Sequence, residues 1–344
     1  MQFIKPGINI DFIGRRKIAF ILSLAMILIT IGSLLFHGGL RLGVDFAGGT
    51  VIQVKFDSAV SIADVKSALK SIEIGTSSVQ EFGAAKENEY LIRADSSATI
   101  TEDISLNIEQ SLQQTTGHQA QIRRVDMVGP QVGRDLREKA LLAMFFALLF
   151  ITIYISGRFE LKWMLSGVMA GALMLAVYVL TIFNVSIPFL MTAAVIVTLI
   201  LFWFLELKYA MGAIVALIHD VTITVGIFSI LDKEFTLPII AALLTIIGYS
   251  LNDTIIVFDR IRENLRKHHK QPLDVILNTS INETLGRTIL TSLTTLIVLI
   301  TLFILGGGII HDFAFAMIIG VLVGTYSSIF VASPILLAWQ NRKR

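Results

Sequence analysis

Long apolar runs alternate with short polar ones along most of this 344-residue chain. A helix needs about 20 apolar residues to cross the hydrocarbon core of a bilayer. We therefore predict a polytopic α-helical membrane protein with eight spans, at about residues 17–36, 139–156, 163–183, 187–205, 210–231, 236–258, 286–305 and 312–339.

One long polar segment, at about 38–136, separates the first two predicted spans. Strand-like and amphipathic helical stretches alternate within it, and they predict the order β-α-β-β-α-β, which is typical of a ferredoxin-like α+β domain. Near its start, Gly43, Gly48 and Gly49 accompany Asp45. We interpret these four residues as a tight entry into the first strand, in preference to a ligand site.

Composition supports a membrane protein, since only 16% of the residues are charged and 54% are hydrophobic. Soluble globular chains average roughly 25% charged residues. The net charge of +2 says little, but the positions of Lys and Arg are informative. With eight spans, one side of the membrane receives nearly all the loop cations, at Arg15–Lys17, Arg158, Lys162, Lys208, Arg260–Lys270 and Arg342–Arg344, while the short loops of the other side hold only Lys233.

The positive-inside rule assigns the cation-rich side to the cytoplasm. Residues 1–37 then form a cytoplasmic N-terminus and an uncleaved first span, residues 38–136 an outer domain, and residues 137–344 the remaining membrane domain with a cytoplasmic C-terminus. Asp259, Arg260, Arg262 and Glu263 mark the cytoplasmic edge, at the start of a predicted loop at about 259–285.

Asp253 interrupts the sixth predicted span. A carboxylate at the bilayer centre costs roughly 2.5–3.5 kcal/mol on insertion scales, which makes it a candidate functional residue. It lies six residues before Asp259 and therefore on the order of 9 Å inside the membrane edge. Tyr249 and Ser250 precede it by one turn on the same face, and Asn252 adjoins it.

Arg287 lies just inside the next span, which leaves the side that the Asp253 helix enters. A polar stripe continues along that helix at Thr284, Thr288, Thr291, Thr294 and Thr295. Asp253 and Arg287 could therefore meet at similar depth and ionise as a pair. A carboxylate that alternately pairs and separates could bind a proton on one side and release it on the other, and a static ion pair that pins two helices is the alternative.

His219 and Asp220 lie near the middle of the fifth span. Adjacent residues on a helix point in different directions, so these two need not pair with each other. A functional role and a purely structural hydrogen-bonding role both remain open.

An internal repeat relates GRFELKWMLSGVMAGALMLAV (157–177) to WFLELKYAMGAIVALIHDVTI (203–223). Local duplication of a helix pair explains it most simply, and convergence on a common membrane-edge pattern is the alternative. Between Trp163 and Leu205 the only ionisable residue is Tyr178. We therefore predict that the helix pair at about 163–205 is a scaffold or a partner contact outside any proton path.

Several of these motifs together resemble the SecF family, the smaller half of the bacterial SecD–SecF protein-export complex. The resemblance covers nearly the whole chain and is carried by LGVDFAGGT (42–50), VGPQVG (128–133), ALIHDV (216–221), GYSLNDTIIVFDRIREN (248–264) and TLGRTILTS (284–292). The family is related to proton-driven RND-type transporters and has six spans, so the pair at 163–205 is a departure from its pattern.

The resemblance implies a function. Family members use the proton motive force to help draw preproteins across the inner membrane through the Sec channel, together with SecD. The family's proton-transport residues fall on Asp253 and Arg287, and its His-Asp motif falls on His219 and Asp220. The resemblance also implies the bacterial inner membrane, with residues 38–136 in the periplasm and no cofactor beyond the proton gradient.

Two other readings compete with this one. The chain could be a structural subunit that stabilises the translocase without proton coupling, or a small-molecule RND-type exporter. An enzyme is not expected, because the sequence has no phosphate-binding glycine loop, metal-ligand cluster or nucleophile–base arrangement. We expect no metal site and no nucleic-acid partner.

Overall fold

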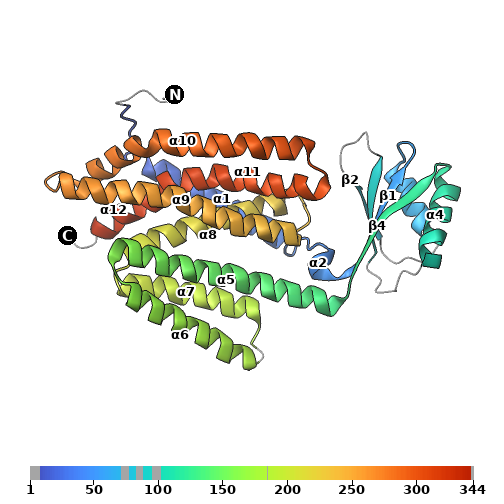
Figure 1. The fold of residues 1–344 in the computed structure, drawn as a ribbon, viewed down its shortest axis with the longest axis horizontal. Coiled ribbons are helices and arrows are strands. Elements are labelled where there is room, and N and C mark those ends of the chain that lie inside the picture. Colours follow the sequence, from blue (N-terminus) through green and yellow to red (C-terminus); the bar gives the residue numbers. More distant parts are fainter. Residues whose placement is uncertain (1–7, 71–76, 83–87, 95–101, 184, 342–344) are drawn as a thin grey trace.

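The computed structural model describes residues 8–70, 77–82, 88–94, 102–183 and 185–341. A bundle of long helices makes up most of the molecule, and a small sheet domain lies at one end of it (Figure 1). The bundle helices are α1 (Arg16–Phe36), α5 (Pro130–Glu160), α6 (Trp163–Ile182), α7 (Ile187–Phe204), α8 (Lys208–Ile230), α9 (Leu237–Lys267), α10 (Leu273–Leu305), α11 (Gly308–Ser327) and α12 (Ser333–Asn341).

In the described part of the chain, seven helical segments are long and apolar enough to cross a membrane. They are α1, α5, α6, α8, α9, α10 and the run from α11 through the π-helical turn Ser328–Ala332 into α12. The apolar helix α7 is shorter. Pro188 and Pro238 stand in the first turns of α7 and α9, where a missing N–H costs no intrahelical hydrogen bond.

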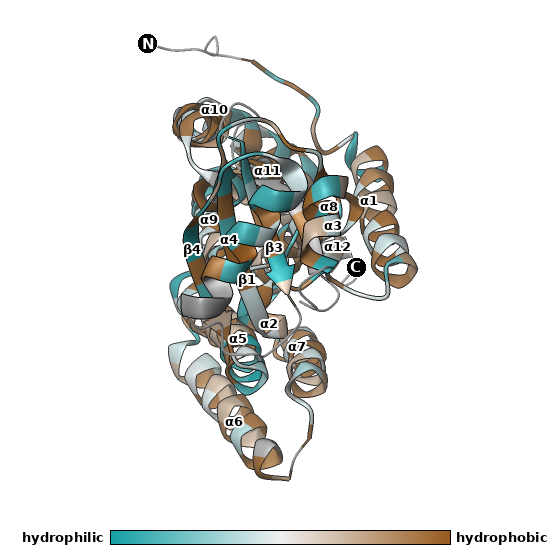
Figure 2. Ribbon diagram, turned by 90° about the vertical axis from the view of Figure 1, so that its right-hand side faces the viewer, coloured by the Kyte–Doolittle hydropathy of each residue, from teal (hydrophilic) through white to brown (hydrophobic). Residues whose placement is uncertain are grey.

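Burial separates the central helices from the peripheral ones. In their most apolar windows, α8 and the α11–α12 run are 61% buried and α9 is 56% buried, whereas α1 and α10 are 17% buried. In Figure 2 much of the ribbon of the peripheral helix α1 is coloured as hydrophobic, although little of this helix is buried within the bundle. Helices α8, α9 and α11 therefore form its centre, and this is where a charged side chain would be shielded.

The predicted extra pair, α6 and α7, packs along α5 on the side of the bundle away from α10 (Figure 1). Met169, Ala170 and Leu173 of α6 and Leu190 of α7 enter the core that α5 and α8 share. The pair therefore enlarges the bundle without touching the α9–α10 interface.

The sheet domain contains four antiparallel strands in the order β2-β3-β1-β4. The strands are β1 (Gly49–Phe56), β2 (Ser77–Phe82), β3 (Glu89–Ala94) and β4 (Ala120–Val128). Alternate residues of β1 and β3 are buried against α3 (Ile62–Lys70) and α4 (Glu102–Thr116), which is why both helices lie on one face.

Two details differ from the sequence expectations. The predicted cytoplasmic loop at 259–285 is mostly helical, because α9 and α10 continue beyond their apolar parts and only residues 268–272 connect them. The second is a short helix, α2 (Val44–Ala47), which occupies the predicted strand entry.

Candidate functional site

Asp253 lies in the middle of α9 with only 1% of its surface exposed. Its Oδ2 atom is buried and has no hydrogen-bond partner among the described residues. The Ser292 and Thr291 hydroxyls of α10 lie within hydrogen-bonding reach of the carboxyl group, and the Arg287 guanidinium acts on it through its charge alone. The acceptor atom Oδ2 is therefore vacant while the carboxyl group faces α10.

Contacts between α9 and α10 set the depth of Asp253. Toward the sheet domain, the Tyr249 hydroxyl donates to the Thr291 carbonyl at 3.0 Å. Toward the α9–α10 connection, the Asn264 amide donates to Glu283 at 2.7 Å. The two helices are antiparallel, so Asp253 lies between these two contacts, and its carboxyl group faces Thr291 and Ser292 of α10.

Arg287 is exposed on the surface of α10. Within the described residues, no ion pair joins it to Asp253, so its effect on the carboxylate acts without direct contact. The Thr288 hydroxyl of α10 is also buried and, like Asp253 Oδ2, has no partner among the described residues. Each of the two helices thus carries one buried polar atom without a hydrogen-bond partner.

Most of the threonine hydroxyls along α10 form hydrogen bonds within that helix. The Thr284, Thr291 and Thr294 hydroxyls donate to carbonyl groups three or four residues earlier in their own helix. Asn252, which the sequence analysis grouped with Asp253, is exposed on another face of α9. Among these predicted polar residues, only Thr288 leaves a buried hydroxyl unbonded.

His219 and Asp220 form a second buried centre, on α8. The two side chains do pair, with His219 Nδ1 2.9 Å from Asp220 Oδ1. The Ser250 and Ser327 hydroxyls donate to Asp220 Oδ2 at 2.6 Å and 2.7 Å. Both oxygens of Asp220 are therefore bonded, in contrast to Asp253.

This second centre extends to α1 and α11. His219 Nε2 lies 3.1 Å from Ser23 Oγ, and Ser23 lies 3.1 Å from the Tyr326 hydroxyl. Tyr326 also donates to the Ala19 carbonyl at 2.7 Å. The sequence analysis missed Ser23, Tyr326 and Ser327, although each is a polar residue within an apolar run.

The residues predicted to mark the cytoplasmic edge join three helices. Asp259 of α9 pairs with Arg158 of α5 at 2.6 Å, and Arg262 donates to the Arg158 carbonyl at 3.0 Å. Arg260 pairs with Glu263 at 2.8 Å and lies 3.4 Å from Glu283 of α10. These contacts hold the ends of α5, α9 and α10 together below the buried carboxylates.

The entry residues flank α2. Gly43 precedes it, Asp45 lies within it, and Gly48 and Gly49 follow it with φ of 76° and 116°. Such values favour glycine because a Cβ atom would be strained there. The turn leads directly into β1 at Gly49.

Comparison with known proteins relates this architecture to protein export. The family model "Protein export membrane protein SecD/SecF, C-terminal" matches residues 107–189 and 180–342, and the "SecD/SecF GG Motif" model matches residues 33–60. Protein translocase subunit SecF of Magnetococcus marinus is 44% identical over 343 residues, which cover 98% of this chain and 94% of the relative. Its counterpart in Rickettsia prowazekii is 36% identical and is covered to 95%. The chain belongs to the SecF family.

Solved SecDF structures share the fold. SecDF of Thermus thermophilus, described as a translocon-associated membrane protein, superposes with a TM-score of 0.76 at 30% identity over 98% of this chain. SecDF in a super-membrane-facing form gives a TM-score of 0.63 at 30% identity. The chain spans only 39% and 40% of those longer chains. As a SecF-family protein with seven apolar helical segments of membrane-spanning length in its described part, it is a multi-pass membrane protein and a component of protein transport.

Proposed function

We propose that this SecF-family chain couples proton movement across the inner membrane to preprotein export, with Asp253 as the residue that binds the proton. The observation that carries this proposal is the buried and vacant Oδ2 atom of Asp253. A proton can bind there without breaking a hydrogen bond. Asp220, whose oxygens are both bonded, offers no such vacancy.

Arg287 is the counter-charge in this proposal. It acts on Asp253 through its charge and forms no ion pair with it in the described structure, so protonation changes their attraction without first breaking a contact ion pair. Each proton that crosses the membrane gains about 2.3 kcal/mol per 100 mV. That energy is enough to shift the balance between two conformations of the bundle that differ by a few kcal/mol.

The partners belong to the same proposal. We infer that SecD supplies the other half of the assembly, that the Sec channel delivers the preprotein, and that the sheet domain holds the emerging preprotein in the periplasm. The sheet domain and the α9–α10 connection lie at opposite ends of the bundle, which supports this orientation (Figure 1). We further propose that α7 is an eighth span and that the sheet domain, with its order β2-β3-β1-β4 and two helices on one face, is ferredoxin-like.

The test compares Asp253→Asn and Arg287→Met in membrane vesicles that contain the full SecD–SecF complex. Both changes should abolish the stimulation of export by the proton motive force while leaving assembly intact. Asp259→Asn is the matched control, since this half-exposed carboxylate lies on the same helix in an ion pair with Arg158. Full stimulation in both test variants would contradict the proposal and favour a structural subunit.

A further inference from the structure

The segment between α1 and β1 is hydrogen-bonded to the loop between α8 and α9. The Phe235 N–H donates to the Arg41 carbonyl at 2.7 Å, and the Gly43 N–H donates to the Phe235 carbonyl at 2.9 Å. Leu42 and Phe235 thereby form an isolated parallel bridge. We call residues 41–49 together with residues 232–237 the clasp; it lies where the bundle meets the sheet domain (Figure 1).

Asp45 supplies the cap that α9 lacks. Thr236 occupies the N-cap position, but its side chain makes no capping hydrogen bond. The Leu237 N–H donates instead to Asp45 Oδ2 at 2.9 Å, across 192 residues of sequence. A carboxylate is favoured here both as an acceptor for a free N–H and by the positive end of the helix dipole.

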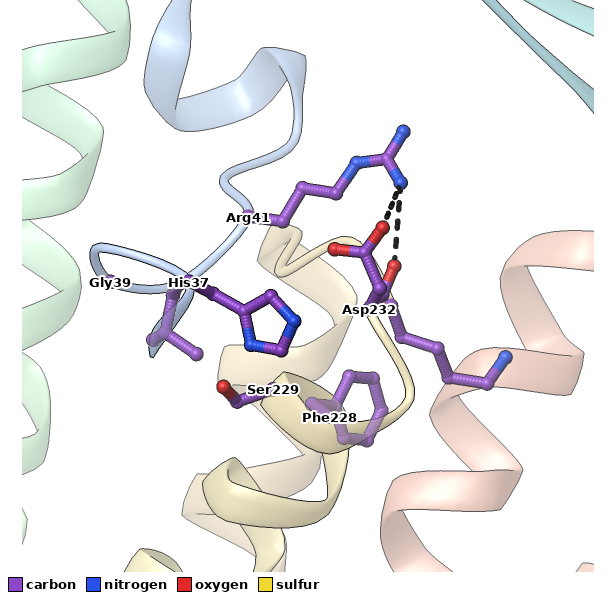
Figure 3. Close-up of a pocket in the computed structure, with 8 residues that line it drawn as sticks. His37, Gly39, Arg41, Phe228, Ser229 and Asp232 are labelled. Atoms are coloured by element: carbon purple, nitrogen blue, oxygen red, sulfur yellow. Dashed lines mark hydrogen bonds and ion pairs between the residues drawn. The ribbon is translucent and has the colours of Figure 1, made fainter. Parts of the chain in front are cut away.

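Ion pairs tie the clasp to both halves of the molecule. Arg41 reaches Asp232 at 2.8 Å, beside a pocket of about 240 Å³ that also contains His37 (Figure 3). Arg93 of β3 donates to the Leu42 carbonyl at 2.7 Å and lies 3.7 Å from Glu234. The side chains of Arg93 and Glu234 are only 13% and 14% exposed, so this contact is less screened than a surface pair.

Close packing holds the clasp against the first turn of α5. Phe46 of α2 is 3% exposed and lies against Phe235. A Cβ atom on Gly48 would come within 2.8 Å of the Pro130 Cα atom, and one on Gly133 within 3.0 Å of the Phe46 carbonyl oxygen. The clasp therefore presses directly on the first turn of α5 as well as on α9.

We propose that the clasp is a rigid coupling that transmits movement of α9 to the sheet domain, with Asp45 as the residue that positions the end of α9. This inference rests on the proposed function, because the movement starts at Asp253. Sixteen residues of continuous α-helix separate Leu237 from Asp253, about 24 Å. A displacement of α9 at Asp253 would thus be transmitted to the clasp along one continuous helix.

The first test breaks the cap. Asp45→Ala should lower proton-dependent stimulation of export roughly fivefold or more, in line with the loss of a capping residue, while proton uptake that depends on Asp253 persists. Asp45→Asn keeps an acceptor oxygen and should retain most of the stimulation. Both are measured in vesicles that contain the full SecD–SecF complex. Unchanged stimulation in Asp45→Ala would overturn the coupling.

The second test replaces the cap by a covalent bond. A Cβ atom on Gly43 would lie 3.5 Å from the Thr236 Cβ atom, which is within the range of disulfides. The chain has no cysteine, so Gly43→Cys with Thr236→Cys would form one defined bridge. Oxidation should leave stimulation intact in the otherwise unchanged chain and restore it in Asp45→Ala, and reduction should remove the rescue.

The outcomes separate two kinds of failure. If oxidation of the cysteine pair stops export in the otherwise unchanged chain, the clasp must open during the cycle and the rigid coupling is wrong. If Asp253→Asn loses stimulation but Asp45→Ala keeps it, the clasp fails while the proposed function stands. If Asp253→Asn keeps full stimulation, the proposed function itself fails.

Discussion

Two buried carboxylates on neighbouring helices have opposite hydrogen-bonding states. Asp220 is bonded through both oxygens, to His219, Ser250 and Ser327. Asp253 has a vacant oxygen and no contacting cation within the described chain. A buried acceptor with a complete set of donors loses hydrogen bonds if its partners move, whereas a proton can bind to an unpartnered oxygen without breaking a hydrogen bond. This contrast supports our proposal that Asp253 binds the proton and predicts that Asp220 braces the bundle.

The bracing role of Asp220 gives a prediction at the level of single residues. Ser250→Ala or Ser327→Ala would leave a buried carboxylate oxygen short of a donor, and each should lower stability by about 1–3 kcal/mol. Thermal unfolding in detergent measures this. Thr245→Ala is the control, because Thr245 is exposed on α9 and its hydroxyl bonds only to Ala241 of its own helix. Equal stability of all three variants would contradict the bracing role.

Helices α9 and α11 touch at glycines, and this contact positions both carboxylate centres. A Cβ atom on Gly320 would come within 2.3 Å of the Ile246 side chain, and one on Gly324 within 2.9 Å of Ser250 Cβ. Small residues let helix backbones approach closely in membranes. The sequence shows the glycine spacing, but only the packed bundle shows that Gly324 lies against the serine that bonds Asp220.

Gly324→Ala should therefore separate α9 from α11. The added methyl group meets a packed side chain and backbone, and the expected loss of stability is about 1–3 kcal/mol. Gly248→Ala is the matched control, because its Cβ atom would meet nothing within 4 Å. Unfolding midpoints of the two variants in the same detergent provide the measurement. If the Gly324→Ala protein were as stable as the control, the two helices would have moved apart without loss of stability, which would contradict the prediction.

At the scale of the whole molecule, the α6–α7 pair lies apart from the two buried carboxylate centres. The Asp253 and Asp220 centres involve α1, α8, α9, α10 and α11. The α6–α7 pair packs mainly on α5, with an outlying contact between Trp203 and Trp339. Its position agrees with the absence of ionisable residues other than Tyr178 between Trp163 and Leu205.

Removal of residues 163–205 tests this division. The deletion takes out an even number of crossings and should preserve the orientation of α8 through α12. Proton-dependent stimulation and co-purification with SecD should both persist, although stability should fall because Met169, Leu173 and Leu190 leave the core. Loss of SecD binding would show that the α6–α7 pair is a partner contact. Loss of proton coupling while SecD still binds would contradict the prediction that the pair lies outside the proton path.

Several features of the site could be predicted from the sequence because they depend on near neighbours. Apolar runs of helical length predict the α-helical membrane class, and the identity of Asp253 and Arg287 as charges within such runs is visible without coordinates. Their similar depth, predicted by counting residues from a common membrane edge, stays a prediction. Helix rise and period are local properties, so residues close in sequence determine them.

The direction in which each polar residue points could not be predicted in this way. Asn252, Asp253 and Ser250 are near neighbours on α9, yet the first is exposed, the second faces α10 and the third reaches Asp220 on α8. The rotation of α9 about its axis decides this, and it depends on packing against Gly320 and Gly324 from far along the chain.

The sequence by itself determined the membrane class, the long polar segment after the first apolar run, and the family. It also showed which charges lie within apolar runs, because each of these depends on composition, local periodicity or motif order. Only the tertiary structure decided which carboxylate is left vacant, which serines brace the other, and that Asp45 caps a helix 192 residues away. The physical reason is that hydrogen bonds and close contacts between distant segments exist only after helices from both ends of the chain have packed together.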